Sequence, residues 1–272
     1  MSDISYPLTI INQQYFNTMK KPLILVTNDD GITAPGIKAL VEVASKLGEV
    51  VVIAPDSPQS GMGHAITVNN PIRIDKSEVF GKIKAFSCSG TPVDCVKVGI
   101  FHILKRKPDL VVSGINHGSN AATNVIYSGT MSAAVEGSME NIPSIGFSLD
   151  DFQHEADFKP TQHFAEIIMK KALASDFPRS VCLNVNIPKL PLEELKGIKV
   201  CRQAAAFWED RFDEREDPLG KKYYWLTGEF KDQEGADDTD MAALQKGYVS
   251  VVPVQFDMTA HHAIPQLNGW KL

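Results

Sequence analysis

The four cysteines of this 272-residue chain form none of the close pairs that hold a zinc ion or a redox-active disulfide. The spacing of Cys88, Cys95, Cys182 and Cys201 contains no C-x-x-C motif, which excludes the common zinc-binding and thioredoxin-like patterns. Unpaired cysteines are typical of a reducing compartment. We therefore expect a cytoplasmic protein.

Long apolar runs are absent as well. Residues 1–20 lack a basic segment followed by a long apolar one, so they predict neither a signal peptide nor a membrane anchor. We expect them to be a loosely held N-terminal extension, followed by a single α/β domain over residues 21–272. No association with a membrane is expected.

The chain has no excess of positive charge. Its 27 Lys and Arg residues against 33 Asp and Glu residues give a net charge of −6, which argues against a protein that neutralises many phosphates of a nucleic-acid duplex. The basic run at 105–107 lies at the end of a predicted helix, where cations complement the helix dipole. The hydrophobic content of 43% is enough for a full core, and internal repeats and low-complexity tracts are absent.

What the chain does have is an alternation of short apolar runs with segments of helical periodicity, up to about residue 190. This pattern predicts an α/β fold: a three-layer, Rossmann-like arrangement in which a mostly parallel sheet has helices on both faces. The predicted strands are 23–27, 50–54, 83–87, 110–113, 144–148 and 181–187. The predicted helices are 37–47, 91–105, 130–140 and 161–174.

The character of the chain changes after about residue 190. Residues 206–230 combine charged clusters with an aromatic stretch at 223–225 and a turn at 218–220, which predicts a long projecting β-hairpin. Exposed aromatic side chains favour contact with a partner. We therefore expect residues of about 200–272 to form an oligomerisation segment, with a helix at 241–246 and a strand at 248–256.

The most informative motif is Asn28-Asp29-Asp30-Gly31, which follows directly on a buried strand. Successive strand residues point to opposite faces, so the two carboxylates can converge only where the chain turns. Two ionised carboxylates about 4 Å apart repel by about 4 kcal/mol at an effective dielectric near 20, and a divalent cation removes this penalty. The alternative is an ordinary turn with an Asp at a helix N-cap.

Other polar residues follow neighbouring strands of the predicted sheet. Ser60 follows the second strand and Asn116 follows the fourth, and ligands of open parallel sheets bind beyond the carboxyl ends of the strands. Asp29, Asp30, Ser60 and Asn116 are therefore candidate oxygen ligands of one divalent cation, Mg²⁺ or Mn²⁺, with Ca²⁺ also compatible.

A second polar element is Ser128-Gly129-Thr130, directly before a predicted helix. Free backbone N–H groups, the positive end of the helix dipole and two hydroxyls could face one anion here, and a phosphate is the obvious candidate. The alternative is a simple N-cap and turn.

Several familiar motifs do not fit. The Gly61-Met62-Gly63 segment lacks the third glycine and the downstream acid of a dinucleotide fingerprint. Ser60 lies in no G-x-S-x-G elbow, so a serine hydrolase is a poor fit. His64 and His117 flank the candidate site and could form hydrogen bonds to a substrate, but we interpret them as ordinary loop residues. We interpret 261–262 as a surface pair.

Five ordered blocks of the chain together resemble the survival protein E (SurE) family over roughly residues 22–150. The blocks are Leu25-Val26-Thr27-Asn28-Asp29-Asp30-Gly31-Ile32, the Ser60-Gly61 loop with Ala65-Ile66-Thr67, Gly90-Thr91-Pro92-Val93-Asp94-Cys95-Val96, Val112-Ser113-Gly114-Ile115-Asn116 with Gly118 and Asn120, and Tyr127-Ser128-Gly129-Thr130. A weaker similarity extends over 247–253.

The resemblance implies a phosphoric monoester hydrolase, a metal-dependent nucleotidase that releases phosphate from nucleoside 5′- and often 3′-monophosphates. By motif position, Asp29, Asp30, Ser60 and Asn116 are expected to bind one divalent cation per subunit. Asn120, Ser128, Gly129 and Thr130 are expected to hold the substrate phosphate. Family members commonly form homodimers or homotetramers by exchanging C-terminal segments.

Two questions of mechanism stay open from the sequence. Water activated by the metal could attack the phosphate directly, with Asp29 or Asp30 as general base and catalytic residue, or the reaction could pass through a covalent aspartyl phosphate. A nucleotide sensor that binds without turnover is the alternative function. A sensor gains nothing from a metal beside the phosphate, so the acid pair favours the enzyme.

Overall fold

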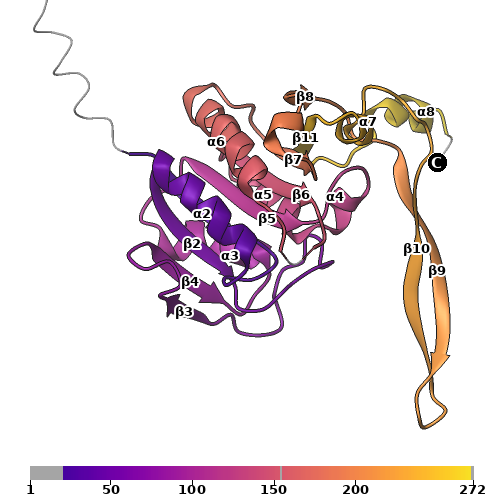
Figure 1. Cartoon of the computed structure of the whole chain (residues 1–272), viewed down its shortest axis with the longest axis horizontal. Coiled ribbons are helices and arrows are strands. Elements are labelled where there is room, and N and C mark those ends of the chain that lie inside the picture. Colours follow the sequence, from indigo (N-terminus) through magenta and orange to yellow (C-terminus); the bar gives the residue numbers. More distant parts are fainter. Residues whose placement is uncertain (1–20, 154, 271–272) are drawn as a thin grey trace, which may run out of the picture.

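A large twisted sheet covered by helices forms the body of the protein, and a long two-stranded hairpin projects from it (Figure 1). The computed structural model describes residues 21–153 and 155–270. The expected N-terminal extension, residues 1–20, lies outside the described part.

The elements have the following bounds. The strands of the large sheet are β1 (Leu23–Thr27), β2 (Glu49–Pro55), β3 (Ile74–Ser77), β4 (Lys84–Cys88), β5 (Leu110–His117), β6 (Ser144–Asp150), β7 (Val181–Pro188), β8 (Ile198–Val200) and β11 (Val249–Gln255), and those of the hairpin are β9 (Ala206–Glu216) and β10 (Lys222–Asp232). The helices are α2 (Pro35–Leu47), α3 (Pro92–Val98), α4 (Asn124–Tyr127), α5 (Gly129–Met139), α6 (Lys159–Ala174), α7 (Asp240–Gln245) and α8 (Ile264–Asn268).

The strand order of the large sheet is β3-β4-β2-β1-β5-β6-β7-β11-β8. The six strands from β4 to β7 are all parallel and follow the doubly wound order, so the chain reverses direction across the sheet between β1 and β5. β3 and β11 are antiparallel to their neighbours β4 and β7. The predicted α/β class with a mostly parallel sheet and a C-terminal hairpin is confirmed.

Strand β1 is buried on both faces, which explains its continuous apolar sequence. Ile24 and Val26 point into a core that includes α2 and α6, whereas Leu23 and Leu25 point into a second core with residues of α3 and α5. The sheet is therefore the middle layer of three, as the sequence predicted.

Two helices begin as their sequences dictate. The Thr91 hydroxyl accepts a hydrogen bond from the Asp94 backbone N–H, and the Asp94 carboxylate accepts one from the Thr91 backbone, which forms a capping box before α3. At the start of α2, Gly36 lies so close to β5 that an added Cβ would be 1.9 Å from the carbonyl oxygen of Ile115. This contact holds the helix against the strand that carries Asn116.

Several elements differ from the sequence prediction. β5 runs on to His117 through an irregularity between Ser113 and Asn116, so Asn116 lies in the strand rather than after it. The predicted helix 91–105 is α3 followed by a π-helical turn, Gly99–Ile103. β3, β8, α4 and α8 are elements of three to five residues, too short to show a periodic signal in the sequence.

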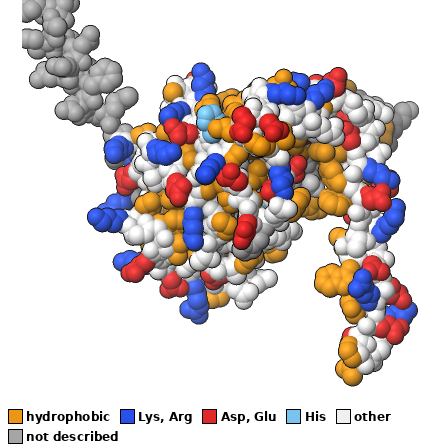
Figure 2. Space-filling model, viewed as in Figure 1, with side chains coloured by type: hydrophobic (Ala, Val, Ile, Leu, Met, Phe, Trp, Pro, Cys, Tyr) orange, Lys and Arg blue, Asp and Glu red, His pale blue; other side chains and the backbone are white. Residues whose placement is uncertain are grey.

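The predicted hairpin is present. β9 and β10 pair along their full length, from Ala206 opposite Asp232 to Glu216 opposite Lys222. Large apolar side chains on it stay exposed among the charged ones, including Phe212, Trp225 and Leu226 (Figure 2). Among the described residues, we find no helix long and apolar enough to cross a membrane.

We expect Gly36→Ala to destabilise the protein by about 1–3 kcal/mol, because the new methyl group must push β5 away from α2. Chemical denaturation measures this change in the free energy of unfolding. Lys38→Ala, at an exposed position of the same helix, is the matched control and should be nearly neutral. Equal stability of the two variants would contradict the close contact.

Candidate active site

The chain turns sharply at the carboxyl end of β1. The Asn28 side chain donates from Nδ2 to the carbonyl oxygen of Gly31 at 2.9 Å, and Gly31 takes a φ of +97°, which favours glycine. Asp29 and Asp30 lie within this bend. The turn therefore lets two consecutive acids share one end of the sheet, as the sequence indicated.

Asp29 is almost completely buried, with 4% of its surface exposed. The Thr130 hydroxyl donates to its Oδ1 at 2.5 Å, and Gly129 lies so close that an added Cβ would be 2.9 Å from its Oδ2. Burial, and secondly the charge of Asp30, raise the pKa of Asp29 to about 6, although the hydroxyl and backbone N–H of Thr130 oppose this shift. The N-terminus of α5 thus packs directly on this carboxylate.

Asp30 is less enclosed but has fewer partners. Burial raises the pKa of its carboxyl group, and a hydrogen bond from the backbone of His117 partly offsets this effect. Its Oδ2 atom is buried and accepts no hydrogen bond in the structure. Asp30 therefore presents an unsatisfied carboxylate oxygen at the end of the sheet.

Asn116 joins the site from β5, the strand next to β1. Its Nδ2 donates to the carbonyl oxygens of His117 and Gly118, at 3.2 and 2.9 Å. These bonds fix the amide so that Oδ1 is turned away from the two carbonyls. Asn116 can therefore offer an oxygen ligand, as its sequence position suggested.

Ser60 belongs to the exposed loop after β2. The adjacent Gln59 donates its backbone N–H to the carbonyl oxygen of Asp29 at 2.8 Å, so the loop is tied to the acid turn. Farther along, the Gly63 N–H donates to the carbonyl oxygen of Tyr127 at 3.2 Å. The three segments with candidate ligands thus meet at the carboxyl ends of β1, β2 and β5.

The contacts that anchor this loop carry no recognisable signal in the sequence. Glu136, on α5 and 2% exposed, contacts His64 Nε2 at 3.0 Å through Oε2 and accepts a hydrogen bond from Lys97 Nζ at 2.6 Å through Oε1. Asp94 accepts the backbone N–H of Thr67 at 3.1 Å. His64 is therefore a specific contact of the Ser60 loop rather than an ordinary loop residue. It lies 72 positions from Glu136, and no local pattern signals such a pair.

The candidate phosphate residues divide into two groups. Ser128 is the N-cap of α5, and its hydroxyl accepts the Met131 N–H, while Thr130 is committed to Asp29. Asn120 donates to the Ser148 hydroxyl at 2.8 Å and its backbone bonds to Asn184 and Asn186. The amide network around Asn120 was not apparent from the sequence. The role of these residues toward phosphate stays a prediction.

The four candidate metal ligands suit a hard cation. Two carboxylates with raised pKa values gain most from a neighbouring positive charge, and the buried Oδ atoms of Asn28 and Asp30 and the Ser113 hydroxyl lack partners nearby. In the described part of the chain, no three His, Cys, Asp or Glu side chains converge as a metal cluster. A set with two acids and two neutral oxygens fits a cation such as Mg²⁺, which retains several waters.

We expect cations to stabilise the protein more at a pH well above 6 than at a pH well below it. The native Asp29 has a pKa of about 6 against 3.8 for the free side chain, so its contribution to stability is full below pH 3.8 and is lost as the pH rises from there through 6. A cation that binds the ionised pair reverses this loss, by about 2.7 kcal/mol at a concentration 100 times its Kd.

The increase in melting temperature on adding Mn²⁺ or Mg²⁺ at the two pH values measures this difference. Asp29→Asn should abolish it, whereas Asp75→Asn, an exposed position on β3, should retain it. Equal increases at both pH values would contradict the coupling.

Comparison with known proteins places the chain in a family. The model of the family described as survival protein SurE matches residues 24–210. Proteins named 5′-nucleotidase SurE are 62% identical in Christiangramia forsetii, over 93% of this chain and 98% of that protein, and 47% identical in Bacteroides thetaiotaomicron, over 92% and 96%. The crystal structure of the SurE protein from Aquifex aeolicus is similar, with a TM-score of 0.79 and 41% identity over 91% of this chain and 98% of that one. The chain therefore belongs to the survival protein SurE family.

Proposed function

We propose that the protein is a metal-dependent 5′-nucleotidase that hydrolyses nucleoside 5′-monophosphates, and also 3′-monophosphates, to nucleoside and inorganic phosphate. The observation that carries this proposal is the pair of desolvated carboxylates, Asp29 and Asp30, at the switch point of a doubly wound sheet. The names of the relatives at 44–62% identity support the same activity.

The proposed cofactor is one divalent cation per subunit, Mg²⁺ or Mn²⁺, held by Asp29, Asp30, Ser60 and Asn116. All four residues would bind the metal through oxygen atoms, and oxygen ligands suit these ions better than zinc. When bound, such a cation supplies a Lewis acid that polarises the phosphate and lowers the pKa of water.

The residues of the chain have separate roles in the proposed reaction. Thr130 holds Asp29 through a hydroxyl and a backbone hydrogen bond, which leaves Asp30, with its unpartnered Oδ2, as the more available carboxylate. The N-terminus of α5 supplies a positive field beside the acids, where charge on the transferring phosphate would be offset. We assign direct attack by water, with one carboxylate as general base, in preference to a covalent aspartyl phosphate.

The proposed location is the cytoplasm. All four cysteines are free thiols in the structure, and three of them, Cys88, Cys95 and Cys182, are buried. Unpaired thiols suit a reducing compartment.

We also propose that the protein is a homodimer or homotetramer whose contacts use the C-terminal segment. In the pairing register, Leu226 lies opposite Phe212 and Tyr224 lies two residues along on the same face of the hairpin. These side chains are 55–69% exposed, and two-fold symmetric contacts are the commonest way to cover such a face.

Asp30→Asn should lower kcat/KM for AMP by more than about 100-fold, because it removes the charge of the less constrained carboxylate and keeps its shape. Phosphate release from AMP in the presence of Mn²⁺ measures the effect. Asp75→Asn is the control for a charge lost elsewhere. Near-normal turnover of Asp30→Asn at saturating Mn²⁺ would contradict the metal assignment, and nucleotide binding by the wild-type protein without phosphate release would support a sensor instead.

Shortening the hairpin should reduce the oligomer mass. Replacing residues 212–226 with a short Gly/Ser turn removes the exposed apolar face but keeps the pairs from Ala206–Asp232 to Arg211–Thr227. Light scattering on the full chain and on this variant measures the change. A monomeric full chain, or an unchanged mass of the variant, would show that the hairpin makes no contact between subunits.

A further inference from the structure

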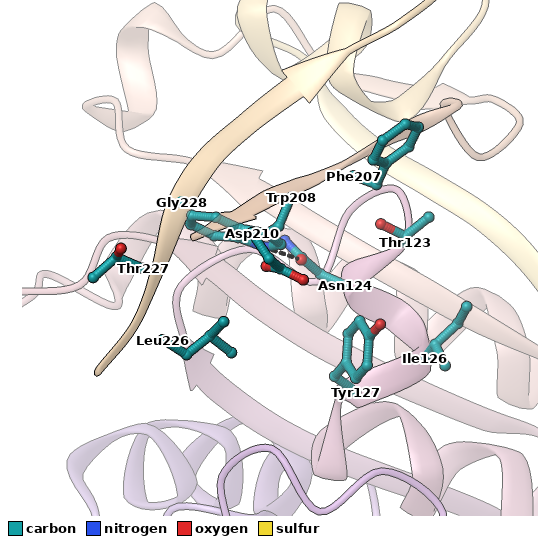
Figure 3. A pocket seen from close by; sticks show the side chains of 10 residues that line it. All are labelled: Thr123, Asn124, Ile126, Tyr127, Phe207, Trp208, Asp210, Leu226, Thr227 and Gly228. Atoms are coloured by element: carbon teal, nitrogen blue, oxygen red, sulfur yellow. Dashed lines mark hydrogen bonds between the residues drawn. The ribbon is translucent and has the colours of Figure 1, made fainter. Parts of the chain in front are cut away.

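A cavity of about 690 Å³ lies between α4 and the base of the hairpin (Figure 3). Ile126 and Tyr127 form part of its wall on the α4 side, and Trp208 and Leu226 form part of its wall on the hairpin side. Cavities that bind small molecules have volumes of about 300–1,000 Å³ and are lined mainly by apolar and aromatic side chains. The cavity therefore has the size and lining of a ligand site.

The aromatic rings of this cavity are well placed for stacking. The Trp208 indole is fixed, because its Nε1 donates to Asn124 Oδ1 at 3.0 Å and its ring packs against Phe230 with 5.4 Å between centroids. Tyr127 is 61% exposed and lies on the opposite wall (Figure 3). Aromatic faces of this kind bind nucleobases with little dependence on the base, since every base has a π-face.

The cavity is next to the candidate active site. Tyr127 directly precedes Ser128, the N-cap of α5, so its Cα lies within about 8 Å of the Gly129 Cα. The hydrogen bond from Gly63 to the Tyr127 carbonyl brings the Ser60 loop to the same corner. In a nucleoside 5′-monophosphate a single ribose separates the phosphate from the base. A phosphate beside Asp29 and Asp30 thus leaves the base within reach of this cavity.

We propose that this cavity is the nucleobase subsite, in which the base of a nucleoside monophosphate stacks on Tyr127 and Trp208. The Asp210 carboxylate, which also lines the cavity, accepts hydrogen bonds from ring or amino N–H groups of the base. This inference rests on the proposed nucleotidase function and adds the part of the substrate that the acid pair does not contact. The occupant that competes with it is the hairpin of a second copy of the chain.

The test compares two substrates that differ in the base alone, AMP and ribose 5-phosphate. Trp208→Ala and Tyr127→Ala should each lower the ratio of kcat/KM for AMP to that for ribose 5-phosphate by roughly 5- to 150-fold, mainly through KM. Trp208→Phe and Tyr127→Phe retain an aromatic ring and are the matched controls, which should keep most of the wild-type ratio. The two alanine variants lie on different walls, so one of them suffices if the other fails to fold.

The outcomes separate the two proposals. If the wild-type protein hydrolyses neither substrate, the nucleotidase proposal fails. If it hydrolyses both and each alanine variant loses activity equally toward both, the base subsite is overturned. An equal loss accompanied by a lower mass in light scattering also overturns it and identifies the cavity as a contact with a second copy.

Discussion

The contact between the N-terminus of α5 and the end of β1 is the constraint on which the candidate site depends. Thr130 donates to the Asp29 carboxylate, and Gly129 approaches it more closely than a residue with a Cβ could. The helix therefore compensates a buried negative charge with its own positive end. The same helix carries Glu136, which contacts His64 and Lys97. One element thus positions both the acid turn and the Ser60 loop.

Much of the fold could be predicted because its signals are local. Consecutive residues are enough to predict the apolar strand β1, the capping box at Thr91 and the two paired eleven-residue strands of the hairpin. The acid pair was also predictable, since a strand that ends in Asn-Asp-Asp-Gly must turn there. β5 was predicted too short because Gly114 resembles a strand end, whereas the strand continues to His117.

The remaining features of the site depend on residues far apart in the sequence. Thr130 and Asp29 are separated by 101 positions, and Asn120 and Asn186 by 66. The sequence indicated that Ser128 and Thr130 could face an anion, but it could not show that the Thr130 hydroxyl is already engaged by a carboxylate of the chain itself. Such pairs form only when the sheet brings β1, β5 and β7 into one layer. The hydrophobic periodicity of the sequence does not predict them.

Acids in the described part of the chain differ in how their buried oxygen atoms are satisfied. Burial tends to raise the pKa of Glu136, but its contacts with His64 and Lys97 lower it overall, and Asp240 accepts backbone N–H groups from Ala122 and Ala204. Asp30 instead keeps an unpartnered oxygen and a raised pKa. Unsatisfied buried charge destabilises a fold and persists where something else binds it. The fold satisfies its structural acids internally, which supports the proposal that Asp29 and Asp30 bind a cation from outside the chain.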